Sequence, residues 1–103
     1  MLNMEDTLQF TTEGEKEIFD DVALYALSTC GFCKMSIYFL RTHKIKFRYI
    51  YIDQLDMDVK QNVKSGLKEK FNVNVGFPFL VINEKDVLVG YKEEEWKEKF
   101  QIK

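Results

Sequence analysis

The chain has 103 residues, of which 46% are hydrophobic and 31% charged, values typical of one globular domain with a modest core. Its net charge of −2 comes from 15 basic and 17 acidic residues of intermixed sign, which argues against nucleic acid as a partner. The chain shows no apolar run long enough to cross a bilayer and no secretion signal at its N-terminus, so we expect a cytoplasmic protein without a membrane partner.

Residues 1–20 are interpreted as an N-terminal extension ahead of the main domain, residues 21–103. Leu8 and Phe10 alternate weakly before the charged stretch TEGEKE, which predicts a possible edge strand followed by a turn. Residues 21–27, DVALYAL, form a short apolar run without polar alternation. Such a run is typical of a strand buried on both faces.

A helix is predicted directly after this strand, from Gly31 to about His43, because apolar residues recur there at helical spacing. One stripe comprises Phe32, Met35 and Phe39, and beside it lie Cys33, Ile37 and Leu40.

The second half of the domain repeats the alternation of strand and helix. KFRYIYID predicts a strand, and a helix is expected to begin at Asp56 and to end at NVNVG. FPFLVI and DVLVG, separated by NEK, predict a hairpin. Glu93 to Glu95 favour the start of a last helix through its dipole, with Trp96 and Phe100 packing back one turn apart.

This order predicts an α/β fold. Strands that alternate with helices imply a parallel pair, whereas the hairpin must be antiparallel. We therefore expect a mixed four-stranded sheet covered by about three helices, with a possible extra N-terminal strand.

Cys30 and Cys33 are the only two cysteines of the chain and stand two residues apart. Exchange between dithiol and disulfide needs one thiolate and a second thiol close enough to displace the mixed disulfide. The N–H groups and dipole at a helix start stabilise negative charge by about 0.3 to 2 kcal/mol. Cys30 is therefore the candidate nucleophile, and Cys33, one turn further in, is the candidate resolving thiol.

The neighbours of the pair are candidate substrate-binding residues. Gly31 leaves room for a substrate sulfur, and Lys34 adds a positive charge near the thiols. Thr29 either donates a hydrogen bond to the thiolate or caps the helix. Phe32 either packs on the helix or lines a substrate groove.

Two other interpretations of the cysteine pair stay open at this point. In one, both cysteines are inert core residues, because free cysteine is commonly buried. In the other they bind zinc, but structural zinc takes four ligands. The chain offers only two cysteines and His43, so a second subunit would have to supply the rest, and we expect no metal.

Pro78 is the only proline and heads the strand predicted in FPFLVI. A proline at the start of a strand removes no ladder donor, so its position needs no functional explanation. A cis bond to Phe77 would instead bring this backbone beside the thiols, where it could pair with an extended substrate. Spacing alone does not decide between the two.

Taken together, YALSTCGFC, the helix after it, GFPFLVI and VLVGY resemble the glutaredoxin-like branch of the thioredoxin superfamily, from about Val22 to the C-terminus. The resemblance implies a thioredoxin-like fold in which the first motif cysteine attacks and the second resolves. It also implies a cis-proline beside a substrate groove and a helix-capping turn after the last strand. The residues that match these features are Phe77 and Pro78 for the groove, and Gly90 and Tyr91 for the turn.

Two departures from the family pattern concern glutathione. Family members that use glutathione usually carry a lysine three residues before the first cysteine, where this chain has Leu27, and a Gly-Gly turn followed by Asp, where it reads VGYKEEE. Both features hold the charged ends of glutathione. The chain is thus similar to glutaredoxin-like proteins that take electrons from a flavin-dependent reductase, including the hydrogen donors of ribonucleotide reductase. Glutathione is the less favoured reductant, and no tightly bound cofactor is expected.

The leading hypothesis is a monomeric thiol–disulfide oxidoreductase that reduces protein disulfides or glutathione mixed disulfides through a Cys30/Cys33 cycle. Its role would be redox homeostasis or electron donation to a reductase. The alternative is an iron–sulfur cluster carrier, in which Cys30 of each subunit of a glutathione-linked dimer holds the cluster. The second motif cysteine argues against that alternative.

Overall fold

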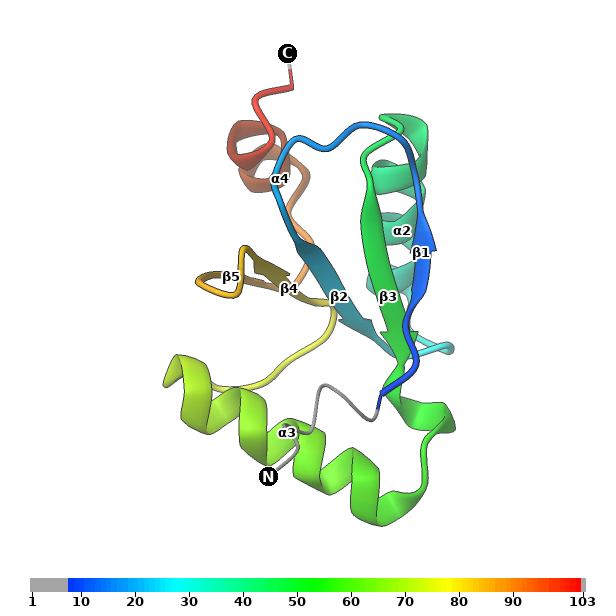
Figure 1. Cartoon of the computed structure of the whole chain (residues 1–103), viewed down its shortest axis with the longest axis vertical. Helices are drawn as coiled ribbons and strands as arrows, with labels where there is room; N and C mark the ends of the chain where they lie inside the picture. The colour runs from blue at the N-terminus through cyan, green and yellow to red at the C-terminus, as the bar shows by residue number, and fades with distance from the viewer. Residues whose placement is uncertain (1–7, 103) are drawn as a thin grey trace.

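A computed structural model describes residues 8–102 of the chain and shows a five-stranded sheet in the order β1-β3-β2-β4-β5 (Figure 1). The elements, in chain order, are β1 (Thr11–Glu13), β2 (Val22–Ala26), α2 (Gly31–Thr42), β3 (Phe47–Tyr51), a 3-10 turn (Ile52–Gln54), α3 (Met57–Phe71), β4 (Phe79–Ile82), β5 (Asp86–Val89) and α4 (Glu93–Lys99).

The sheet is mixed, as predicted. β2 and β3 run parallel, while β1, β4 and β5 pair antiparallel with their neighbours. The extra N-terminal strand is confirmed, but it begins later than the alternation of Leu8 and Phe10 indicated. Both residues pack against the core cluster on the α3 side of the sheet, and the ring of Phe10 contacts Tyr25 edge-on at 5.5 Å.

β2 lies at the centre of the sheet and all five of its residues are buried, which confirms a strand covered on both faces. Leu24 and its alternate neighbours pack in the cluster that contains α2 and α4, while Tyr25 faces the cluster that contains α3. The molecule therefore has three layers. Figure 1 shows α3 at the bottom of the view, apart from α2, which runs alongside β1 and β3.

The buried face of α2 takes residues from both of the apolar sets found at helical spacing. Phe32 and Met35 are 61% and 52% exposed, whereas Phe39 of the same stripe is buried. A helix turns about 100° per residue, and the residues that meet the sheet form a face that lies beside Phe32 and Met35 and includes Phe39. They are Cys33, Ser36, Ile37, Phe39 and Leu40.

The remaining elements confirm the predictions. α3 begins after Asp56 and ends before Asn72, which adopts a left-handed conformation with φ 53°. In the hairpin, Asn83 and Glu84 both have positive φ. This is the backbone conformation of the hairpin turns whose twist matches the twist of the flanking strands. Trp96 of α4 is fully buried. Within the part of the chain described, no helix has the length and apolar character needed to span a membrane.

Candidate active site

The predicted site residues meet at one edge of the sheet, where β2 and β3 both end. Ala26 pairs with Tyr51 in the parallel ladder and Tyr25 pairs with Phe79 in the antiparallel one. Continuing both registers places Asp53 beside Ser28 and the Phe77–Pro78 segment beside residues 26–27. The cysteine motif follows directly, because only four residues separate Ala26, the end of β2, from the start of α2 at Gly31.

Cys30 forms the N-cap of α2. Its backbone is extended, and its Sγ accepts a hydrogen bond from the N–H of Cys33 at 3.2 Å. Cys30 is half-buried, and its sulfur lies at the N-terminus of α2, where the first backbone N–H groups have no partner within the helix. The expectation that Thr29 caps the helix is wrong, since the cap is one residue later. Thr29 is exposed, and its hydroxyl makes no hydrogen bond to either sulfur among the residues described.

Cys33 lies inside the core, with no exposed surface. Its Sγ accepts a hydrogen bond from the N–H of Leu27 at 3.4 Å. Burial raises the pKa of the Cys33 thiol to about 12, and the hydrogen bond with Cys30 acts in the same direction. The two thiols are therefore unlike each other: one is accessible at a helix end, and the other is enclosed and protonated at neutral pH.

The raised pKa of Cys33 predicts a loss of stability at alkaline pH. A thiol in the unfolded chain has a pKa of about 8.5, whereas folded Cys33 keeps its proton up to about 12. Between these values the folded state holds one more proton, so the free energy of unfolding falls as pH rises. From pH 7 to 10, urea unfolding should show the reduced protein losing about 2 kcal/mol more than Cys33→Ala. Equal losses in the two proteins would contradict the raised pKa.

Asp53 is a site residue that the sequence interpretation missed. Its carboxylate accepts a hydrogen bond from the N–H of Ser28 at 2.9 Å, and its second oxygen accepts one from the Ser28 hydroxyl. These two bonds keep the pKa of the Asp53 carboxyl below its usual value. Ser28 and Leu27 lie in the turn that carries Cys30, and the Cys30 N–H donates to the Leu27 carbonyl. Asp53 thus fastens the cysteine turn to the end of β3.

The Phe77–Pro78 peptide bond is cis, and the β2–β4 register, continued past the pair Tyr25 and Phe79, brings this segment beside residues 26–27. The Pro78 carbonyl accepts a hydrogen bond from the Gly90 N–H at 2.8 Å. Phe77 is half-buried and packs against both core clusters, and the ammonium of Lys64 lies 5.8 Å from its ring centre. A basic side chain of α3 therefore borders the segment.

Gly90 and Tyr91 do not cap α4, contrary to expectation. The N-cap is Lys92, which makes no side-chain capping bond. Gly90 has φ +81°, a conformation that favours glycine, and its carbonyl accepts a hydrogen bond from the Trp96 indole at 3.2 Å. Tyr91 packs edge-on against the same indole. The turn is held by an aromatic side chain of the helix and not by capping.

The other predicted substrate-binding residues face outward. Gly31 has open space where a Cβ would point, and Phe32 and Lys34 are exposed on the first turn of α2. Phe32 is not among the side chains that pack against either core cluster. No set of three or more His, Cys, Asp or Glu side chains is arranged as metal ligands within residues 8–102.

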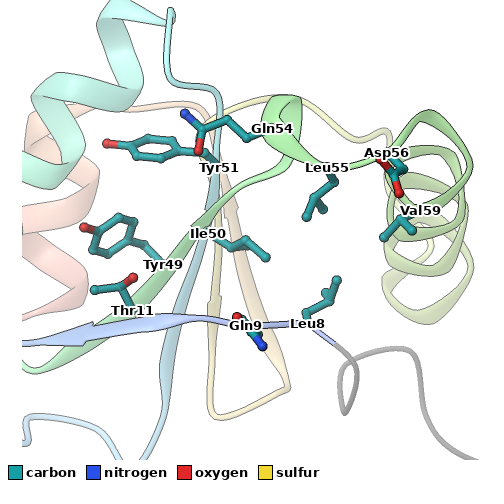
Figure 2. Close-up of a pocket in the computed structure, with 10 residues that line it drawn as sticks. All are labelled: Leu8, Gln9, Thr11, Tyr49, Ile50, Tyr51, Gln54, Leu55, Asp56 and Val59. Atoms are coloured by element: carbon teal, nitrogen blue, oxygen red, sulfur yellow. The ribbon is translucent and has the colours of Figure 1, made fainter.

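A separate pocket of about 590 Å³ lies at the β1–β3 edge (Figure 2). Neither cysteine lines it. Tyr51 and Gln54 belong to its wall, so it reaches the chain on either side of Asp53. Figure 2 shows the rings of Tyr49 and Tyr51 pointing to one side of β3 and Leu55 pointing to the other. The pocket is a neighbour of the thiol site and does not contain it.

A mixed sheet, a CxxC pair at the start of a helix and a cis-proline beside it define a thioredoxin-like dithiol protein. The chain belongs to the glutaredoxin family, since residues 22–87 match the sequence model of that family, described as glutaredoxin. The search against curated proteins returned no match.

Solved structures of archaeal proteins are similar to this chain. A glutaredoxin from Methanosarcina mazei Go1 is 29% identical with a TM-score of 0.75, over 90% of this chain and 88% of that one. A glutaredoxin from Archaeoglobus fulgidus is 31% identical with a TM-score of 0.66, over 76% and 83%. Methanosarcina acetivorans methanoredoxin is 28% identical with a TM-score of 0.67, over 78% and 83%.

Proposed function

We propose that the chain is a thiol–disulfide oxidoreductase that reduces disulfides by a Cys30/Cys33 cycle. The Cys30 thiolate attacks one sulfur of the substrate disulfide, forms a mixed disulfide and releases the other sulfur as a thiolate that takes a proton from water. Cys33 then gives up its proton and attacks Cys30 Sγ. The second substrate thiol leaves, the two electrons have passed to the substrate, and a Cys30–Cys33 disulfide remains.

The asymmetry of the two thiols is the observation that carries this proposal. Cys30 is accessible, and a helix N–H donates to its sulfur at 3.2 Å. Cys33 is fully buried and its pKa is raised by that burial. A substrate in solution can reach only the first thiol. The second is placed, one helical turn away, to react with a disulfide already formed on the first.

The same geometry supports a proposal about the reductant. Leu27 stands where glutathione-using relatives carry lysine, and its side chain packs against both core clusters. It therefore offers no charge for a glutathione carboxylate. We propose protein disulfides and glutathione mixed disulfides as substrates, and a flavin-dependent reductase, ahead of glutathione, as the electron source for a monomer acting in the cytoplasm.

The test measures reduction of insulin and of a glutathione mixed disulfide, with two reducing systems supplied in turn. One system is glutathione with its reductase, and the other is NADPH with thioredoxin reductase. We expect turnover with the second system and little with the first. Turnover with neither substrate would contradict the oxidoreductase proposal, whereas efficient turnover with glutathione would contradict only the assignment of the reductant. A brown protein after purification without oxygen would favour the cluster carrier instead.

A further inference from the structure

Three large apolar side chains form an exposed stripe on the outer face of α2. Phe32, Met35 and Tyr38 are 61%, 52% and 72% exposed, and their spacing of three residues places them along one side of the helix. We name this set the α2 stripe. Only three other large hydrophobic side chains among residues 8–102 are exposed, and none lies on α2: Met57 at 76%, Val89 at 40% and Ile18 at 39%.

We propose that the α2 stripe is the docking surface for a protein partner that carries apolar and acidic side chains next to its disulfide. This inference rests on the proposed function and names the class of substrate that the thiol site accepts. The proposed occupant of the α2 stripe is a polypeptide; a small disulfide can react at Cys30 without contacting the stripe.

The first support is continuity with the reactive thiol. The stripe begins at Phe32, two residues after Cys30, within the motif itself. Cys30 is the N-cap of α2, so a polypeptide that is joined to Cys30 Sγ and extends along the outer face of this helix meets the stripe first at Phe32. From Phe32 to Tyr38 the helix rises about 9 Å. A small disulfide held at Cys30 leaves that length of the helix uncovered.

The second support is charge. α2 contains no acidic residue, whereas the chain as a whole has a net charge of −2. Its two basic residues differ: Arg41 is engaged by a two-bond ion pair with Glu13 at 2.8 Å, while Lys34 is exposed beside the stripe, one turn before Tyr38. An apolar face bordered by a lysine complements a partner surface that is apolar and acidic.

The test follows single-turnover oxidation of the reduced protein, so that no reductase competes for the surface. The first probe is a synthetic peptide with an intramolecular disulfide flanked by leucine and glutamate residues. The second is the same peptide with lysine in place of glutamate, and the third is bis(2-hydroxyethyl) disulfide. The variant is Met35→Gln/Tyr38→Gln, because glutamine removes the apolar surface and keeps helix propensity. Met57→Gln, on α3 and 76% exposed, is the matched control.

We expect the double variant to react about 10-fold more slowly with the glutamate peptide and within about twofold of wild type with the small disulfide. The wild type should prefer the glutamate peptide to the lysine peptide, and Met57→Gln should match the wild type throughout. Equal slowing with all three probes, or none with the glutamate peptide, would overturn the proposal. A wild-type dimer that the double variant dissociates, with unchanged peptide rates, would assign the stripe to self-association instead. Failure of the wild type to react with any probe would contradict the oxidoreductase function itself.

Discussion

Replacing Cys30 with serine is expected to reduce disulfide turnover at least about 1,000-fold, because the nucleophile is lost and a hydroxyl does not form the mixed disulfide. The variant should fold normally, since serine at this position keeps an N-cap acceptor for the Cys33 N–H. Steady-state reduction of insulin, with circular dichroism as the folding control, measures both effects.

Cys33→Ser is the informative counterpart, because it removes only the second step. Cys30 can still attack, so a covalent adduct with a protein substrate should accumulate and be visible by non-reducing electrophoresis and intact mass. Multiple turnover of protein disulfides should stop after that adduct forms. If the wild type and both variants reduced disulfides equally, the assignment of the two thiols would be untenable.

The second large effect is expected at Asp53. Asp53→Ala leaves the N–H and hydroxyl of Ser28 without their partner, and each lost bond to a charged acceptor costs about 1.5 to 3 kcal/mol. These bonds fasten the turn that presents Cys30. We therefore expect kcat/KM for disulfide reduction to fall about 10- to 100-fold, because the nucleophile is no longer held in place.

Asp53→Asn separates the hydrogen bonds from the charge. Asparagine can still accept from the Ser28 N–H, while the negative charge that opposes ionisation of Cys33 is gone. We expect kcat/KM within a few-fold of wild type or above it. Asp56→Ala is the matched control, since Asp56 lies three residues away and makes no side-chain capping bond. A loss in Asp53→Asn as large as in Asp53→Ala would show that Asp53 does not act by holding the turn.

The order of strands and helices could be predicted because each element carries its own local signal. The buried strand 22–26 is a continuous apolar run, and the hairpin is marked by NEK between two such runs. The spacing of Cys30 and Cys33, followed by helical periodicity, was sufficient to place the pair at a helix start. The cis state of Pro78 came only from the family resemblance, since spacing did not distinguish it from an ordinary strand-start proline.

The missed features depend on contacts between distant segments. Asp53 ends the stretch KFRYIYID, and only the parallel register of β2 and β3 brings it to Ser28. The signal was present, since polar residues at the carboxyl ends of parallel strands meet at one edge. On α2, apolar residues occur on both the inner and outer faces, so periodicity alone did not show which of them are buried. Thr29 was a reasonable capping residue by composition, but the sulfur of Cys30 takes that position.

The most direct test of the account is the site of alkylation in the reduced wild-type protein. Less than one equivalent of iodoacetamide is added at pH 7, and the labelled peptides are separated and weighed by mass spectrometry. We expect label almost entirely on Cys30, because Cys33 is buried and its thiol stays protonated. Label chiefly on Cys33, or equally on both, would contradict the division of roles between the two thiols.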